Sequence, residues 1–255
     1  MRILQGIYLI TGLLLATVFL GCNSEDANDC FQTAGTIVQE ERPATDFSRI
    51  LVNEGITMVI KQAPEYKVVV ESGENLMNDI HTEVKDGQLI LTNNNICNYV
   101  RKYEFTTIFV AAPDIAEIRS ATQREIRSEG TITTDKLTVY SENYQNNEYL
   151  TSAAIYLNVD VNQFQIVFNG ISNIYMTGKA KSLNINMASG NGRFEGRNFP
   201  VENATVYHRS SNDVIVKAST LLKGDIYSTG DIISVGIPQT VEIVEHYKGK
   251  LIYEE

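Results

Sequence analysis

Tryptophan is absent from this chain of 255 residues, and histidine and cysteine are scarce, at 3 residues each. The histidines, His81, His208 and His246, stand far apart and lack the spacing of metal ligands. No glycine-rich phosphate loop opens a helix, and no long amphipathic helix is visible. The sequence therefore offers no motif for a metal, a nucleotide or another cofactor.

Basic residues are also in the minority, because 21 Lys and Arg face 31 Asp and Glu and give a formal net charge of -10. Phosphate backbones are bound by clustered Lys and Arg side chains, and no basic stripe is present. Nucleic acid and an anionic membrane surface are therefore excluded as expected partners.

Long apolar runs are absent after residue 20, and the only one is residues 7–20, which is short for a stable membrane span. Arg2 before it and Gly21-Cys22 after it predict a targeting segment over residues 1–21. The ending Phe19-Leu20-Gly21-Cys22 resembles a bacterial lipoprotein signal, although Phe19 departs from the usual aliphatic residue. This resemblance implies lipidation of Cys22; the alternative is an ordinary secretory signal with an incidental cysteine.

Residues 22–35 predict an acidic, solvated tether that cannot pack a core. The stretch is similar to acidic export signals of surface lipoproteins in the Bacteroidetes. We therefore expect an outer-membrane lipoprotein of the cell envelope, attached through its N-terminal lipid. The sequence leaves open whether it faces the periplasm or the cell surface.

Once Cys22 carries lipid, Cys30 and Cys97 remain as an even pair in a chain that has left the cytoplasm. Zinc would need two further ligands that no nearby residue supplies. The pair predicts a disulfide.

Tyrosine is abundant, at 13 residues, and together with Val, Ile and Thr it favours strands. Residues 36–110 predict a β-rich region of alternating strands with hairpin punctuation and one helical turn near residues 74–80. The hairpin signals are Asn53-Glu54-Gly55, Gln62-Ala63-Pro64-Glu65 and Asp86-Gly87.

Residues 111–255 repeat one phrase: a strand, a Gly/Asn/Ser turn, and a second short strand that closes on Gly178, Gly196, Ala218 or Gly236. The first strands begin at Phe164, Leu183, Ala204 and Leu222, so the steps are 19, 21 and 18 residues. A period near 20 indicates stacked coils, each of which buries its apolar face on its neighbours.

The preceding step, from Leu137 to Phe164, is 27 residues. The excess lies in residues 141–154, so we expect an inserted loop there. Insertions project from a solenoid and are free to carry recognition.

Three stretches resemble the bacterial head GIN domain family, whose members carry the label auto-transporter adhesin. They are Asp46-Phe47-Ser48-Arg49-Ile50, Asp86-Gly87-Gln88-Leu89-Ile90-Leu91 and Gly170-Ile171-Ser172-Asn173-Ile174, although the later copy Ser211-Asn212-Asp213 lacks the glycines. The resemblance implies a right-handed parallel β-helix-like fold and an envelope location.

Acidic turn residues need separate consideration because β-helices include carbohydrate-active enzymes, which use paired carboxylates. Asp213 and Asp231 occupy equivalent turn positions, and Glu195 lies near the neighbouring copy. The simpler interpretation is that these side chains cap backbone N–H groups.

Two stretches rich in tyrosine and amides are better candidates for contacts with a glycan or an envelope protein. One contains Tyr99, Arg101 and Tyr103, and the other, in the insertion, contains Tyr144 and Tyr149. Ordinary polar loops are the alternative explanation. The sequence thus predicts an all-β envelope lipoprotein of non-catalytic, adhesin-like or ligand-binding type, with a carbohydrate-active enzyme or a purely structural component as alternatives.

Overall fold

The computed structural model describes residues 30–95, 97–99 and 106–255. These residues form one 17-stranded sheet and a single short helix, the 3-10 helix η1 (Glu74–Asp79), where the sequence predicts a helical turn. No helix in this described part of the chain is long and apolar enough to cross a membrane. The predicted signal segment, the lipidation site Cys22 and most of the tether lie outside the described residues.

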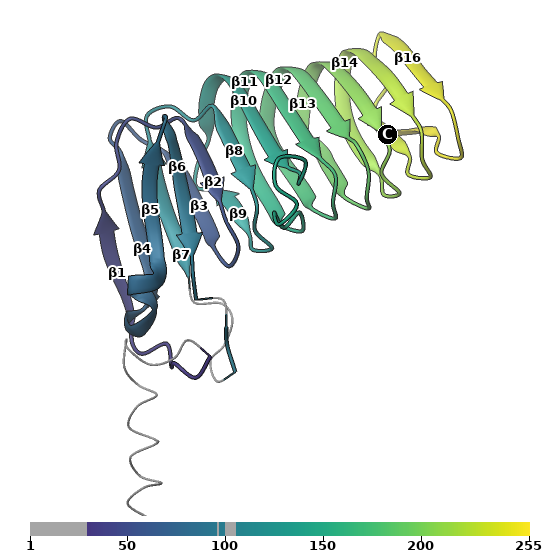
Figure 1. Cartoon of the computed structure of the whole chain (residues 1–255). Coiled ribbons are helices and arrows are strands. Elements are labelled where there is room, and N and C mark those ends of the chain that lie inside the picture. The colour runs from purple at the N-terminus through teal and green to yellow at the C-terminus, as the bar shows by residue number, and fades with distance from the viewer. Residues whose placement is uncertain (1–29, 96, 100–105) are drawn as a thin grey trace, which may run out of the picture.

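The sheet coils upon itself, so that it presents two ladders of strands around a common core (Figure 1). Strands β11 (Ala154–Phe168), β12 (Asn173–Met187), β13 (Arg193–His208) and β14 (Val214–Ile226) each contribute to both ladders. Their second halves follow β10 (Ile132–Ser141) and end on β16 (Thr240–Glu245), in what we name ladder A. Their first halves lead to β15 (Ile232–Val235) and β17 (Leu251–Glu254), in ladder B.

All pairing along these coils is parallel, and equivalent residues lie one above another. Ile155 pairs with Ile174, and Phe164 pairs with Leu183. Both offsets are 19 residues, which is the step between the first strand starts. Because the side chains of a strand alternate between the two sides, each coil adds one layer to the same buried columns. Phe164, Ile166, Ile185 and Phe194 are each at most 1 % exposed in this core.

The repeat differs from the predicted pattern in one respect. In β11 to β14 the two short strands expected at each step are joined into one long strand, and Gly178 lies inside β12 with φ +93°, whereas β15 and β16 remain separate. A Cβ atom at Gly178 would lie 2.0 Å from the carbonyl oxygen of Val159, so glycine lets the backbone bend without leaving the ladder.

One predicted hairpin is confirmed at the N-terminal end. Strands β5 (Ile80–Lys85) and β6 (Gln88–Asn93) are antiparallel and joined by Asp86 and Gly87. Both turn residues have positive φ, 49° and 73°, as a two-residue hairpin turn requires.

The other two predicted hairpins are wrong. Strand β2 (Arg49–Val52) is parallel to β6 and β8 (Glu117–Ser120), and β3 (Thr57–Gln62) is parallel to β7 (Thr107–Ala112) and β9 (Ile126–Ser128). Residues 53–56 therefore connect β2 in ladder A to β3 in ladder B and do not form a hairpin turn between two paired strands. The physical reason is burial: Ile50 to Val52 and Met58 to Ile60 are buried at consecutive positions, as in strands covered on both sides.

The end of the sheet nearest the N-terminus is antiparallel. Strand β4 (Lys67–Gly73) pairs with β7 on one side and with β1 (Ile37–Arg42) on the other. Ladder A thus has the order β5-β6-β2-β8-β10, and ladder B has the order β1-β4-β7-β3-β9 before the long strands. The hydrogen-bonded ladders run without a break across residue 110, where the sequence suggests a regional boundary.

Candidate functional site

Turns gather along one edge of the molecule, where the strands of ladder A end and those of ladder B begin. We name this surface the turn edge; it comprises the loop 142–153 and the turns 169–172, 188–192, 209–213, 227–231 and 246–250. Backbone hydrogen bonds join each turn to the next, for example Ile171 N to Thr151 O at 2.8 Å and Ser211 N to Gly190 O at 3.0 Å. The edge is therefore a continuous scaffold.

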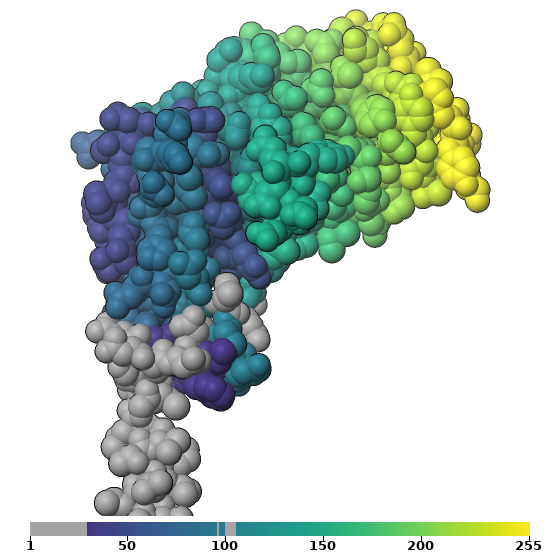
Figure 2. Space-filling model, viewed as in Figure 1, coloured from purple at the N-terminus to yellow at the C-terminus, as the bar shows by residue number. Residues whose placement is uncertain are grey.

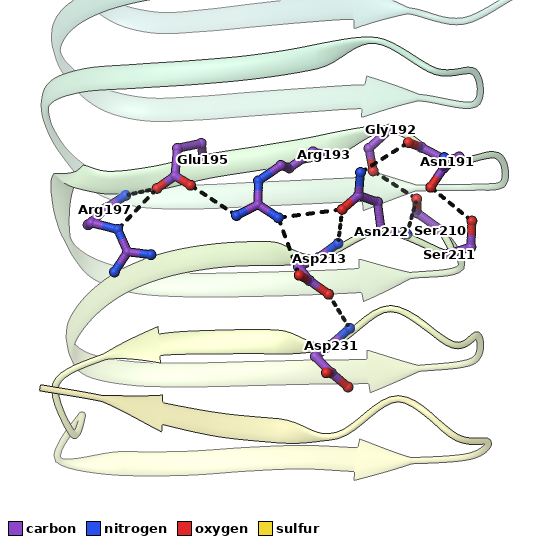
Figure 3. Close-up of polar contacts among 10 residues, drawn as sticks. All are labelled: Asn191, Gly192, Arg193, Glu195, Arg197, Ser210, Ser211, Asn212, Asp213 and Asp231. Atoms are coloured by element: carbon purple, nitrogen blue, oxygen red, sulfur yellow. Dashed lines mark hydrogen bonds and ion pairs between the residues drawn. The ribbon is translucent and has the colours of Figure 1, made fainter.

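Side chains of the turns cap the backbone of neighbouring coils (Figure 3). Ser210 Oγ donates to Gly192 O at 2.8 Å. Asp213 accepts the Asp231 N–H at 3.1 Å, and Asp231 accepts the Lys250 N–H at 2.7 Å. The two aspartates therefore hold successive turns together, in the capping role that their equivalent positions predict.

The carboxylate of Glu195 also has structural partners (Figure 3). Arg193 lies between Glu195 and Asp213, with N–O distances of 3.2 Å to each. Arg197 contacts Glu195 at 3.6 Å and Glu254, on the last strand, at 2.6 Å. These arginines tie the outer surface of ladder B across several coils, which accounts for the carboxylates without a chemical reaction.

The inserted loop lies where the 27-residue step predicts it, between β10 and β11. A buried ion pair fixes its first residue, since Glu142 accepts a hydrogen bond from Arg119 of β8 and the two side chains are 4 % and 6 % exposed. The other carboxylate oxygen of Glu142 accepts the Tyr144 N–H at 2.6 Å. The loop is thus held against ladder A, and Figure 2 shows the teal-green segment around residue 150 standing out from the viewed face.

The two loop tyrosines differ in exposure. Tyr144 is 65 % exposed, whereas Tyr149 is half-buried and donates its backbone N–H to Asn146 O at 3.1 Å. A rigid base that presents an exposed ring is the arrangement of a binding loop, since little conformational freedom remains to be lost on contact. The structure keeps both residues as candidates.

An aromatic column stands on the turn edge at its C-terminal end, and we name Tyr207, Tyr227 and His246 the C-terminal column. Ring centroids of Tyr207 and Tyr227 lie 5.3 Å apart, and the Tyr227 and His246 rings stack at 4.1 Å with an interplanar angle of 5°. His246 Nε2 lies 2.7 Å from Asp225 Oδ1. The tyrosines are 38 % and 41 % exposed, so ring atoms and polar atoms both face solvent.

The Tyr227 hydroxyl is protonated at neutral pH, as in any tyrosine with the ordinary pKa of about 10. Desolvation and the nearby Asp225 carboxylate raise the pKa of Tyr227 above its ordinary value. The hydroxyl can therefore donate a hydrogen bond at neutral pH, while Asp225 supplies an acceptor.

A second aromatic pair lies on the outer face of ladder B. Tyr156 and Tyr175 are in register on β11 and β12, and their rings stack at 4.7 Å with an interplanar angle of 8°. Desolvation, with Tyr175 and Glu125 nearby, raises the pKa of Tyr156. This pair is not on the turn edge.

The predicted disulfide is confirmed. Cys30 and Cys97 are joined, with their Cα atoms 4.5 Å apart, and Tyr99 N donates to Cys30 O at 2.8 Å. Tyr99 is 76 % exposed, and its ring lies 5.7 Å from that of Phe31. The other two candidates of this stretch, Arg101 and Tyr103, lie outside the described residues, so the set as a whole stays a prediction.

The histidines occupy three unrelated environments. His81 is exposed on β5, His246 belongs to the C-terminal column, and His208 is fully buried beneath the turn edge. Burial lowers the pKa of His208, although the backbone of Gly230 and the charges of Asp213 and Asp231 oppose this shift. Within residues 30–95, 97–99 and 106–255, no three His, Cys, Asp or Glu side chains gather as metal ligands.

The C-terminal column is the feature that sequence reasoning missed, since the histidines were treated as scattered. A partial signal was present: Tyr227 and His246 are 19 residues apart, which is the step between β14 and β16, whereas Tyr207 is in register with Asp225 and not with Tyr227. Tyr156 and Tyr175 show the same period, 19 residues. Testing aromatic residues for the repeat period would have found the Tyr227–His246 pair and, separately, the Tyr156–Tyr175 pair.

Together, the stacked strands and the turn edge define an all-β protein whose extended outer surface carries exposed aromatic and polar side chains. The chain belongs to the family described as "Putative auto-transporter adhesin, head GIN domain", whose model matches residues 46–238. This confirms the resemblance of the three sequence stretches. Among curated proteins, none matches the chain.

Solved structures share the fold at low identity. A "putative adhesin" from Bacteroides fragilis has 15 % identity and a TM-score of 0.77, with 87 % of this chain and 99 % of that chain covered. A "putative adhesin" from Parabacteroides distasonis has 18 % identity, a TM-score of 0.65 and the same coverage. A "putative lipid binding protein" from Parabacteroides distasonis has 17 % identity and a TM-score of 0.58, covering 87 % and 98 %. Neither the family description nor these names indicates a catalytic activity.

Proposed function

We propose that this protein is a non-catalytic adhesin of the bacterial cell envelope that binds glycan along its turn edge. The C-terminal column carries the proposal. Its Tyr207 and Tyr227 rings give rigid amphipathic area that suits the C–H faces of a sugar, while Asp225 and His246 supply hydrogen-bonding atoms beside them.

The inserted loop supports an extended ligand. Tyr144 and the column lie on the same edge, separated by the turns 169–172 and 188–192. Neighbouring strands are about 4.8 Å apart, so roughly 15 to 20 Å separates the two aromatic groups. A chain of several sugar units spans that distance, whereas a single monosaccharide does not.

Family membership supports the location and the finer fold. The adhesin description fits an envelope protein, either periplasmic or surface-exposed, that is held in the outer membrane by lipid on Cys22. We also propose that the coils are a right-handed parallel β-helix, because parallel strands joined through a crossover are right-handed in about 98 % of cases.

Binding is tested with the chain from residue 23 onward, screened against bacterial and host glycans and envelope proteins. Removing two rings, in Tyr207→Ala/Tyr227→Ala or in Tyr144→Ala/Tyr149→Ala, should each weaken glycan binding by about 1–3 kcal/mol while the melting temperature changes little. Tyr253→Ala is the matched control, because Tyr253 is 48 % exposed on β17 of ladder B. Cleavage of a polysaccharide, or unchanged binding in both double variants, would contradict the proposal.

Anchorage is tested separately, by mass spectrometry of the mature N-terminus. We expect an acylated Cys22 as the first residue, since several acyl chains contribute about 0.8 kcal/mol per buried methylene and hold a protein stably. An unmodified N-terminus at another residue would show that the segment is an ordinary secretory signal.

A further inference from the structure

A hollow lies on the outer face of ladder B, on strands that contribute no residue to the turn edge. Ala111 of β7 is flanked in register by Lys67 of β4 and Lys61 of β3. Because a methyl group stands between two long side chains, the surface sinks above Ala111 into a space of about 220 Å³. We name it the lysine hollow.

One wall of the lysine hollow is apolar. Two residues away along the same three strands, Val69, Phe109 and Val59 are also in register and point to the same outer face. Val59 is only 3 % exposed, although it lies on the outside of the sheet. All three residues line the hollow, so the lysine stems and the apolar wall form one continuous lining.

The lysine charges are drawn away from the middle of the hollow. Lys67 pairs with Glu41 of β1 at 3.2 Å, and Lys61 pairs with Glu129, next to β9, at 3.1 Å. In the order β1-β4-β7-β3-β9 these carboxylates lie on opposite outer sides. Both pairs are exposed, with all four side chains more than half accessible, so they are weak and readily exchanged.

We propose that the lysine hollow binds an aliphatic carboxylate. The carboxylate lies between the Lys61 and Lys67 ammonium groups, and the first methylenes pack against Phe109 and Val59. A sugar fits less well, because the polar side chains other than the lysines that line the hollow already have partners: Glu129 pairs with Lys61 at 3.1 Å, and the amide of Gln39 donates to Glu71 at 2.7 Å. Ligand pockets usually measure about 300–1,000 Å³, so the hollow holds the charged end of a chain and not its whole length.

The experiment is calorimetric titration of the chain from residue 23 onward, which keeps every described residue, with dodecanoate below its micellar concentration. Acetate tests the charge alone, and dodecanol tests the chain alone. We expect saturable binding of dodecanoate, at least tenfold tighter than that of either probe, and weakening as salt rises because ions screen exposed charges. Equal binding of dodecanol, or no binding of dodecanoate, would overturn the proposal.

Two variants locate the site. Ala111→Leu fills the hollow and should abolish binding with the circular dichroism spectrum unchanged, while Lys61→Gln/Lys67→Gln keeps the stems and should lower dodecanoate affinity to the dodecanol level. Lys179→Gln is the matched control, since Lys179 forms a similarly exposed pair with Asp160 at 3.3 Å. Binding that survives Ala111→Leu would place the ligand elsewhere. This inference is independent of glycan binding, because no residue of the turn edge contributes to it.

Discussion

His208 lies in a buried column between Met187 and Ile226, with Phe168 next after Met187, so its nearest neighbours along the column are apolar. The charged form is disfavoured there, so the pKa of the folded protein is lower than that of the unfolded chain. As pH falls below the ordinary value of about 6.5, the unfolded chain binds a proton that the folded protein does not. The free energy of unfolding should therefore decrease.

The prediction is a melting temperature several degrees lower at pH 5.5 than at pH 7.5, with part of that difference removed by His208→Met. Methionine fits because Met187 already occupies the equivalent position in the preceding coil. His81→Gln, which removes the imidazole of an exposed histidine, is the control substitution. If His208→Met and the native protein respond equally to pH, His208 does not titrate as argued.

Arg119 and Glu142 make the second prediction at this scale. Glu142→Gln removes the carboxylate from a buried guanidinium and should lower the free energy of unfolding by about 3 kcal/mol, near the low end for a broken buried pair. Glu117, 3.9 Å from Arg119, keeps part of the compensation. Urea unfolding measures the loss, and hydrogen exchange should become faster in residues 143–153.

The matched control is Glu129→Gln, which breaks the exposed pair with Lys61 and should cost less than about 1 kcal/mol. Similar losses in the two variants would mean that burial does not strengthen the Arg119 pair.

At the scale of elements, the turns depend on close backbone approach. Gly190 has φ +95°, and a Cβ atom there would lie 2.1 Å from Gly170 O in the preceding turn. Gly130 also has positive φ, +79°, but nothing lies within 4 Å of its Cβ position. A substitution at Gly130 therefore measures the cost of backbone strain alone, whereas one at Gly190 measures strain and steric crowding together.

We expect Gly130→Ala to cost about 1–2 kcal/mol, from the left-handed conformation alone, and Gly190→Ala to cost clearly more. Chemical denaturation of both variants decides this. Equal losses would show that the turn relaxes around an added methyl group.

Elements also show how far sequence can predict this fold. The period near 20 residues correctly located the turns and the inserted loop, because Asn169-Gly170 and Ser189-Gly190 mark them locally. The pairing of β2 with β6 was beyond reach, since Arg49 meets Gln88 across 39 residues and no local turn encodes that contact. The turn after Asn53 looks the same in sequence whether its strands pair with each other or with distant ones.

The candidate site was predictable in part for the same reason. Tyr144 stood out because it lies in an insertion, and Asp213 because it recurs with the turns. His246 joins Tyr227 only through register, which is a property of two coils and not of either segment alone.

At the scale of the whole molecule, the Cys30–Cys97 disulfide ties the first described residue to the connection between β6 and β7. It closes a loop of 67 residues and should contribute about 4 kcal/mol by restricting the unfolded chain. Cys30→Ser/Cys97→Ser should lower the free energy of unfolding by that amount in urea titrations. A reducing agent should destabilise the native protein and leave the variant unaffected; two freely alkylatable thiols in oxidised, folded protein would refute the bond.

The parallel register of β11 to β14 has a consequence for the history of the gene. Each coil meets the next through the same buried columns, so a duplication or loss of about 20 codons, with its ends at equivalent positions, inserts or removes one whole layer and leaves both new neighbours matched. A change of another length is accommodated in a turn, as residues 142–153 are, or as a register shift within a strand pair, as between β12 and β13 and between β13 and β14. The length of such a protein along its stack of coils therefore changes in steps of one coil, about 4.8 Å each. Recombination between repeats can thus alter the distance between the N-terminal end and the C-terminal column while both ends keep their own structure.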